Sequence, residues 1–449
     1  MKKLNILLIA LCLTGICQAQ TPWDGSTKTK PTVEGLKYKV STPAHLAWIA
    51  DACATDENIN GFLGKEIVME ADIDLNNKEW TPIGTGEKPF KGHFLGNNHT
   101  IKNLKINDAS KNYAGLFGYM EGQNNTQGFA EIDSIYLKNV TITAGNYVGS
   151  LCGAAKNATM LHCAVNTSNL NGNAYVGGMA GYIRNASIRI SYAKNITMKV
   201  TEIWGGLFVG LNDTVAISTL KISHCYAKGQ VTCANYGGGF VGGNAYKGKI
   251  EHCYCIIQFA GKVADCHNLG LFCGLNDVDA KLTNCAYNSN MHGNMTTTAI
   301  AENKNEKDGE TDTWSNTKDG MTSLAFYSNF TNESITKQTW KQDFSLTAGT
   351  GYAINEGTPI LTWEYLANVA VRNVDEAQIS VYPNPVRNIL YIKANGTQVE
   401  KVEVMDLLGK TTPVENGTEY VDMSNYKAGV YLVRITTAQG VITKKVAKH

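Results

Sequence analysis

A short glycine-flanked apolar segment occurs six times between residues 113 and 276, at intervals of 28 to 35 residues. A regular period of this length is typical of a solenoid, in which each repeat buries its apolar face only against its neighbours. A solenoid can also account for a chain of 449 residues, because it gains length without needing a larger core. The six copies are Ala114–Gly118, Gly149–Gly153, Gly177–Gly181, Gly206–Gly210, Gly238–Gly242 and Gly270–Gly274.

Alignment of the copies gives two apolar columns, as expected for side chains that face inward from stacked strands. Short runs that alternate with period two and end at Gly or Asn predict two or three strands per repeat. The pattern predicts an all-β fold, a right-handed parallel β-helix of roughly eight turns with strands ~4.8 Å apart. The first column is Leu116, Leu151, Met179, Phe208, Phe240 and Phe272. The second is Ile132, Met160, Ile188, Ile222, Ile250 and Leu282.

The regions outside the repeats have different patterns and predict separate segments. Basic residues, an apolar stretch and small residues open the chain as in a secretory signal. Pro43–Ala54 predicts an amphipathic helix with Thr42 as its N-cap, placed to cap the first turn. The predicted segments are a signal peptide (1–19), an N-terminal segment with this helix (20–64), the β-helix (65–300), its C-terminal cap (301–368), a linker (369–378) and a small antiparallel β-sandwich (379–449).

Charge and motif content exclude several classes of function. The 40 basic and 39 acidic residues leave a net charge of +1, so no strong field attracts nucleic acid. No stretch after the signal is long and apolar enough to form a transmembrane helix. The sequence contains no H-E-x-x-H, G-x-S-x-G or P-loop motif, so no recognised catalytic residues are predicted.

Several cysteine and histidine residues recur with the period of the repeat. Four of the cysteines fall in one inward column, where cysteine acts as a small apolar residue. Their side chains would project in parallel, which suits disulfides poorly, so free thiols are predicted. Three histidines precede column cysteines and predict a solvated outer row, with a zinc site as the less favoured alternative. The cysteines are Cys163, Cys225, Cys253 and Cys285, and the histidines are His162, His224 and His252.

Two acidic patterns were considered as ligand sites. Asp72-x-Asp74-x-Asn76 begins like an EF-hand loop but lacks the glycine and glutamate that follow in that motif. A turn held by side-chain caps explains it better, and bound calcium is the alternative. Asp277 and Asp279 form the closest acidic pair in the later repeats, and a turn cap is again predicted. No cofactor is therefore predicted, with calcium left open.

Aromatic residues stand at the start of five successive repeats. Their strict period favours a stacked ladder that stiffens the solenoid, with ~0.5–1.5 kcal/mol per pair beyond burial. The alternative is an exposed stripe that contacts sugar rings or a protein partner. These candidate ligand-contact residues are Tyr113, Tyr147, Tyr175, Trp204 and Tyr236.

The C-terminal segment carries several motifs in a fixed order: Tyr382, Pro383, Asn384 and Pro385 at its start, Gly409 in a turn, Gly429 and Tyr431, and the basic pair Lys444 and Lys445. Together they resemble the type A sorting domain of the type IX secretion system of Bacteroidota. The resemblance implies export, recognition of this domain by the secretion machinery, and in the family usually its removal and attachment of the protein to surface lipopolysaccharide.

The repeats themselves resemble the GLUG-motif repeats of bacterial surface adhesins and of the non-catalytic part of some immunoglobulin A metallopeptidases. The resemblance rests on Asp72–Leu75, Trp80–Gly84, Phe90–Gly92, Asn98–Ile101 and Ala114–Gly118. It implies a surface protein of the adhesin type, at the outer-membrane surface or outside the cell. The expected role is therefore binding of host protein or glycan surfaces. A carbohydrate-active β-helix enzyme and a structural surface component without a dedicated ligand are the alternatives.

Overall fold

The computed structural model describes residues 22–56, 59–123, 128–215, 219–259, 267–288, 298–305, 311–316, 340–341, 360–361, 364, 379–394, 399–406, 411–413, 419–437 and 440–449. The predicted signal peptide and linker lie outside the described residues, as does most of the predicted C-terminal cap. The chain forms two compact units that divide near residues 321–333, and each is described by itself.

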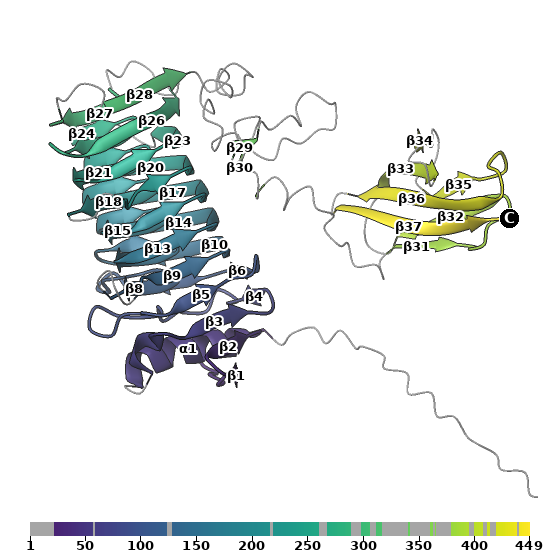
Figure 1. Cartoon of the computed structure of the whole chain (residues 1–449), viewed down its shortest axis with the longest axis horizontal. Coiled ribbons are helices and arrows are strands. Elements are labelled where there is room, and N and C mark those ends of the chain that lie inside the picture. Colours follow the sequence, from purple (N-terminus) through teal and green to yellow (C-terminus); the bar gives the residue numbers. More distant parts are fainter. Residues whose placement is uncertain are drawn as a thin grey trace, which may run out of the picture. The chain divides into compact units, whose positions relative to one another are not determined.

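The first unit is a parallel β-solenoid of about eight turns, which confirms the predicted fold class (Figure 1). Each turn contributes strands to three faces. The first face holds β3 (Glu66–Met69), β5 (His93–Leu95), β9 (Ala130–Asp133), β13 (Ala158–Leu161), β16 (Ser187–Arg189), β19 (Ile222–Ser223), β22 (Lys249–Glu251) and the start of β26 (Lys281–Asn288).

The second and third faces complete each turn. The second holds β4 (Ile73–Asp74), β6 (Thr100–Lys102), β7 (Lys105–Asn107), β10 (Tyr136–Thr143), β11 (Val148–Gly149), β14 (Ala164–Gly177), β17 (Tyr192–Gly206), β20 (Tyr226–Gly238), β23 (Tyr254–Phe259), β24 (His267–Gly270), the rest of β26, and β28 (Thr311–Asn316). The third is a separate parallel sheet of β8 (Phe117–Glu121), β12 (Cys152–Lys156), β15 (Ala180–Arg184), β18 (Val209–Thr214), β21 (Val241–Tyr246), β25 (Cys273–Asn276) and β27 (Ile300–Asn303).

Parallel pairing continues past residue 300, where the sequence pattern placed the end of the β-helix. β27 pairs with β25 and β28 pairs with β26, both in parallel. The glycine-flanked segment is missing from this part of the sequence, so its strands gave no repeat signal. The described solenoid therefore extends to Asn316.

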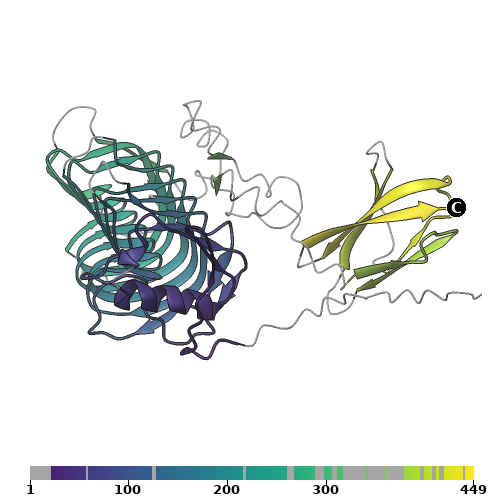
Figure 2. The same ribbon diagram turned by 60° about the horizontal axis from the view of Figure 1, so that its bottom comes forward.

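A helix covers the first turn, as the sequence predicts (Figure 2). The helix α1 spans Pro43–Thr55, and the Thr42 hydroxyl accepts a hydrogen bond from the His45 amide at 3.2 Å. Its apolar side joins the same core as Phe62 and Phe90. A hairpin that the sequence did not reveal lies beside it: β1 (Thr32–Glu34) pairs antiparallel with β2 (Lys37–Val40), which pairs in parallel with β3. A short 3₁₀ turn, η1 (Asn60–Phe62), follows α1.

Both predicted inward columns form continuous stacks. All six residues of the first column are at most 1% exposed. The Phe208 and Phe240 rings lie 4.8 Å apart, and the Phe240 and Phe272 rings 5.0 Å apart, with planes tilted by 17° and 7°. Residues of the second column are register partners from β9 to β26. Each turn therefore buries its apolar residues directly against the equivalent residues of its neighbours.

The column cysteines are free and buried, as predicted, and so are the other described cysteines. Each of the four donates its thiol to carbonyl oxygens of its own turn and of the preceding one, as Cys163 does to Leu161 at 3.2 Å and to Ile132 at 3.8 Å. Burial raises the pKa of the Cys163 thiol well above its usual value, because the thiolate loses its hydration. These thiols are thus apolar core residues of low reactivity.

The last glycine of each repeat segment permits close approach between turns. A Cβ atom built on Gly210 would lie 2.4 Å from the carbonyl oxygen of Gly181, the equivalent glycine one turn earlier. The same contact would be 2.5 Å for Gly242 against Gly210 and for Gly274 against Gly242. Only glycine can occupy these positions without displacing the backbone of the preceding turn.

A buried ladder of asparagine side chains, not anticipated from the sequence, joins the last turns. The Asn212 amide donates to Asn244 at 2.8 Å, Asn244 to Asn276 at 3.0 Å, and Asn276 to Asn303 at 3.1 Å. Asn212, Asn244 and Asn276 are at most 1% exposed. Since buried amides are costly when unpaired, each side chain needs its neighbour in register.

The second unit contains small antiparallel sheets. Strands β31 (Ile379–Tyr382), β32 (Ile389–Ala394) and β35 (Tyr420–Asp422) form one sheet. A second sheet contains β34 (Thr411–Pro413), β33 (Val399–Asp406), β36 (Gly429–Thr437) and β37 (Gly440–Lys448). Apolar residues of both sheets form one core, which includes Ile379, Leu390, Val404 and Val433. In addition, β29 (Trp340–Lys341) pairs antiparallel with β30 (Ile360–Leu361).

Candidate functional site

The predicted aromatic residues line one corner of the solenoid, at the junction of the second and third faces. All five have left-handed backbone conformations, with φ between 50° at Tyr236 and 66° at Trp204. This conformation is unusual for residues with large side chains and costs of order 1–3 kcal/mol each. The corner therefore turns at the same point in each repeat and directs each ring to the outside.

The rings form two stacks. The Tyr147 ring lies 4.7 Å from both the Tyr113 and Tyr175 rings, with planes 5° from parallel. Trp204 stacks on Tyr236 at 4.6 Å. Because the neighbours cover both faces of Tyr147, its ring cannot stack on a sugar. The side chains of this aromatic ladder (Tyr113, Tyr147, Tyr175, Trp204 and Tyr236) are partly exposed, and hydroxyl groups and ring edges are among the groups that they offer to solvent.

Two further tyrosines on the third face pack against the ladder. The Tyr119 ring lies 5.5 Å from Tyr113, and the Tyr182 ring lies edge-on, 5.8 Å from both Tyr147 and Tyr175. At the equivalent position two turns after Tyr182 the residue is Gly243, where a Cβ would lie 2.4 Å from the Trp204 ring. Because Gly243 has no side chain, the Trp204 indole can pack against the sheet at this position.

A row of charged residues runs beside these tyrosines, two residues further along each strand of the third face. Register pairs Glu121, Lys156, Arg184 and Asp213 in successive turns. Lys156 contacts Glu121 at 2.7 Å, and Asp213 contacts Arg184 at 3.8 Å. The Tyr182 hydroxyl donates to Asp213 at 2.5 Å, and burial together with this bond raises the pKa of Tyr182. Opposite charges thus join Glu121 to Lys156 and Arg184 to Asp213, while the register partners Lys156 and Arg184 are both positive.

The aromatic ladder also has a charged contact at its other end. The Tyr236 hydroxyl donates to Glu302 at 2.7 Å. This hydrogen bond lowers the pKa of Glu302 and raises that of Tyr236, because it stabilises the carboxylate and the protonated phenol. Glu302 also contacts Lys304 at 3.3 Å. This carboxylate is therefore already paired with a hydroxyl and an ammonium group.

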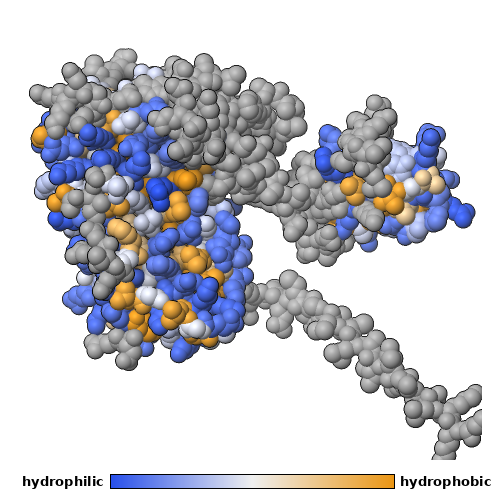
Figure 3. Space-filling view, viewed as in Figure 1, coloured by the Kyte–Doolittle hydropathy of each residue, from blue (hydrophilic) through white to orange (hydrophobic). Residues whose placement is uncertain are grey.

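A groove of about 550 Å³ lies at the Glu121 end of the charged row. Three successive turns form it, through the loop before β5, the end of β8 and the turn after β12. Its lining includes Glu87, Pro89, Lys91, Glu121, Lys156 and Asn157. Figure 3 shows hydrophilic residues over much of the described solenoid surface in that view, with hydrophobic residues in small groups between them.

Sequence reasoning missed the charged row and the groove, although the row had a readable signal. Glu121, Lys156, Arg184 and Asp213 each follow the last glycine of their repeat by three residues. Aligning that position would have shown charges facing one another across turns. The groove had no such signal, because Glu87 and Lys91 come from an irregular loop before the repeats begin.

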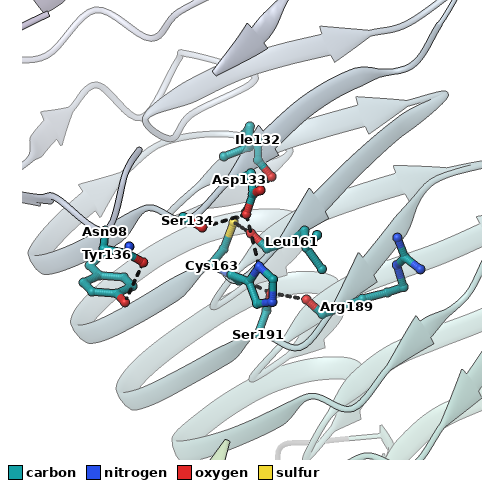
Figure 4. Close-up of polar contacts among 10 residues, drawn as sticks. Asn98, Ile132, Asp133, Ser134, Tyr136, Leu161, Cys163, Arg189 and Ser191 are labelled. Atoms are coloured by element: carbon teal, nitrogen blue, oxygen red, sulfur yellow. Dashed lines mark hydrogen bonds and ion pairs between the residues drawn. The ribbon is translucent and has the colours of Figure 1, made fainter. Parts of the chain in front are cut away.

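The predicted histidine row lies at the corner between the first and second faces. Figure 4 shows the polar contacts around Asp133, Ser134 and Cys163 at this corner. His162 contacts Asp133 of the preceding turn through its Nδ1 atom at 3.2 Å, and the Ser134 hydroxyl donates to the same carboxylate at 2.8 Å. The His162 bond, followed by the Ser134 hydroxyl, holds the pKa of Asp133 below its usual value. Since Ser134 donates to the carboxylate and not to the imidazole, the arrangement does not activate a serine nucleophile.

The other two histidines do not complete a metal site, and the row is less solvated than predicted. The His224 and His252 rings stack at 5.1 Å, while Ile190 separates them from His162. His252 is only 7% exposed. Burial lowers the pKa of His224 to about 4, with the neighbouring His252 adding to the effect. Among the described residues, no three His, Cys, Asp or Glu side chains are grouped as metal ligands would be.

Replacement of Asp133 by asparagine should change the acid dependence of stability. The folded-state pKa of Asp133 is depressed, so its contribution is present at neutral pH and is lost as the pH falls through that lowered pKa. At pH 7 the free energy of unfolding of the variant should be up to about 1 kcal/mol lower than that of the parent protein. This difference should become smaller toward pH 3. Urea unfolding between pH 3 and 7 measures this, with Glu202→Gln as a surface control. A difference that is unchanged at pH 3 would contradict the assignment.

In the first acidic pattern Asp74 caps its own turn and both aspartates also bind the next turn, and in the second pattern Asp277 caps its own turn. Asp74 accepts hydrogen bonds from the Asn76 amide at 2.8 Å and the Asn103 side chain at 2.7 Å, while Asp72 accepts from the Thr100 amide at 2.9 Å. Asp277 accepts from the Val278 amide at 2.9 Å. Nitrogen donors therefore occupy carboxylate oxygens that a calcium ion would need.

The predicted sorting residues lie at the ends and edges of the second unit. Asn384 follows β31, and its side-chain oxygen accepts a hydrogen bond from the Ala447 amide at 2.8 Å, which ties the start of the domain to its last strand. The Tyr431 hydroxyl donates to the Lys427 carbonyl at 3.0 Å. Gly429 begins β36, and Lys444 and Lys445 lie in β37. Gly409 lies outside the described residues.

A known protein family matches the second unit, where the sorting domain was predicted. Residues 380–449 match the secretion system C-terminal sorting domain. The type IX secretion machinery recognises such a domain, so this chain is exported to the cell surface or the extracellular space. Within the described part of the chain, no helix has the length and apolarity needed to cross a membrane.

Part of the chain also resembles a curated protein. The chain is 30% identical over 152 residues to halomucin of Haloquadratum walsbyi. The match covers 32% of this chain and 2% of halomucin, so the chain corresponds to only a small part of that protein. This similarity indicates related segments and assigns no activity.

Proposed function

We propose that this exported solenoid is a non-catalytic binding protein of the bacterial surface, an adhesin that contacts host protein or glycan surfaces. The resemblance to GLUG-repeat adhesins points in the same direction. The sorting domain supports the location, and attachment to surface lipopolysaccharide after its removal would keep the solenoid at the cell.

The observation that carries the proposal is a row of unused hydrogen-bonding groups on the aromatic ladder. The hydroxyls of Tyr113, Tyr147 and Tyr175 make no hydrogen bond with any described residue. Their rings repeat every 4.7 Å and are held parallel by stacking. A row of this kind is preorganised, so little conformational entropy is lost when a partner binds along it.

Binding is favoured over cleavage of a glycosidic bond because the carboxylates of the charged row and Glu302 already have partners. Glu121 pairs with Lys156, Asp213 with Arg184 and Tyr182, and Glu302 with Lys304 and Tyr236. A glycosidase needs two carboxyl groups that converge on one bond. Paired carboxylates spread along several turns suit the cohesion of the solenoid better than that chemistry.

The protein with its sorting domain retained should bind components of arrays that carry host matrix proteins and glycans. Changing Tyr113, Tyr147 and Tyr175 together to phenylalanine keeps the stacked rings and removes the hydroxyls. Binding should then weaken about tenfold or more, since each lost hydrogen bond contributes about 0.5–1.5 kcal/mol. Biolayer interferometry on the captured ligands gives the affinity.

The matched control changes Tyr391 and Tyr420, two exposed tyrosines of the second unit, to phenylalanine, and should leave the affinity unchanged. The absence of binding on every array would contradict the adhesin and favour a purely structural surface component. Release of reducing or unsaturated ends from polysaccharides would instead favour the carbohydrate-active enzyme.

A further inference from the structure

We infer that the groove at the Glu121 end of the charged row binds a sugar unit that carries one carboxylate, such as a uronic or sialic acid of a host glycan. The inference rests on the proposed function and deepens it by naming a site and a ligand class. The volume of the groove, about 550 Å³, lies in the range of small-molecule sites and is larger than the volume that a single ion occupies.

The backbone forms the groove without any loop needing to close over it. A Cβ on Gly122 would lie 2.2 Å from the carbonyl oxygen of Asn157, so β8 and the turn after β12 are in direct backbone contact here. Asn157 is 3% exposed and has a left-handed backbone, with φ of 49°. Glu121, Lys156 and Asn157 are thus presented by fixed turns of the solenoid, and Glu87 and Lys91 reach the groove from the loop before β5.

The charges of the groove point to a ligand with a single negative charge. Lys156 is paired with Glu121 at 2.7 Å. By contrast, the Lys91 ammonium contacts a neutral group, the side-chain oxygen of Asn60, at 3.0 Å. An ammonium has three donors, so Lys91 can still donate to a carboxylate of the ligand. Two lysines and two glutamates sum to zero, which disfavours polyanions such as heparin or nucleic acid.

The remaining groups suit a ligand rich in hydroxyls. Glu87 is exposed at the rim and makes no hydrogen bond or ion pair with any described residue, so its carboxylate can accept from two hydroxyls. The groove also adjoins the aromatic ladder, because a Cβ on Gly86, in the same lining, would lie 3.2 Å from the Tyr113 ring.

Titration calorimetry with the protein that retains its sorting domain tests the inference. The probes are galacturonic acid, 3′-sialyllactose, neutral lactose and a heparin oligosaccharide. One or both carboxylated sugars should bind more tightly than lactose and heparin, and their affinity should fall as salt is raised. Lys91→Gln should weaken the carboxylated sugar about tenfold or more, and Glu87→Gln should weaken it through the hydroxyls.

Lys138→Gln, an exposed lysine of β10 on the second face, serves as the matched control and should change nothing. The inference is overturned if neither carboxylated sugar binds, if heparin or lactose binds as tightly, or if Lys91→Gln retains full affinity. In any of these cases, array binding that depends on the ladder hydroxyls would leave the adhesin standing, so the two failures are distinguishable.

Discussion

Replacing Phe240 by alanine should lower the free energy of unfolding of the solenoid by about 3–5 kcal/mol. The Phe240 ring is fully buried between the rings of Phe208 and Phe272, at 4.8 and 5.0 Å. Its removal leaves a cavity that the neighbours cannot fill, because they are held in register by parallel pairing on both sides. Both the burial of the ring and two aromatic contacts are lost.

Chemical denaturation followed by far-ultraviolet circular dichroism measures this effect. Val278→Ala is the control, because Val278 is 54% exposed and its truncation should cost less than about 0.5 kcal/mol. A loss below about 1 kcal/mol for Phe240→Ala would mean that the aromatic column does not hold adjacent turns together.

Replacing Gly210 by alanine should destabilise the solenoid by about 3 kcal/mol or more, although it adds only one methyl group. The new Cβ would lie 2.4 Å from the carbonyl oxygen of Gly181 and 2.7 Å from the amide nitrogen of Val176. Both are backbone atoms of the preceding turn, so relief requires the two turns to move apart. That movement would weaken the hydrogen bonds that β18 forms with β15 and β21.

The same measurement distinguishes this steric effect from a general intolerance of alanine. Gly429→Ala in the second unit is the matched control, since the nearest atom to its added Cβ is 3.9 Å away. The solenoid transition should be unchanged in that variant. A Gly210→Ala protein as stable as the parent would show that successive turns do not approach as closely as the backbone indicates.

The sequence was sufficient for the parts of the fold that repeat. A column such as Phe208, Phe240 and Phe272 can be read from aligned repeats because stacking requires apolar residues at equal intervals. The helix α1 was also predictable, since Thr42, Pro43 and the apolar spacing are local signals. These features depend on neighbours in the chain or on a fixed period, and both are visible in one sequence.

Features without a period could not be predicted in this way. The β1–β2 hairpin has little apolar alternation, and the strands β27 and β28 lack the glycine-flanked segment. The groove depends on how Glu87 and Lys91, in an irregular loop, come to lie beside Lys156 two turns later. The stacking of the aromatic ladder follows from its period, but only the structure could show that both faces of Tyr147 are covered, which limits the contacts of that ring to its hydroxyl and its edges.

Each turn of the solenoid contacts only the turns next to it. Whole turns can therefore be lost or gained in evolution. Loss or duplication of a whole period, such as residues 182–210, would join equivalent positions and leave every remaining interface intact. The groove comes from the first turns and the asparagine ladder from the last. The length of the solenoid can therefore change by whole periods while the groove at one end keeps its composition.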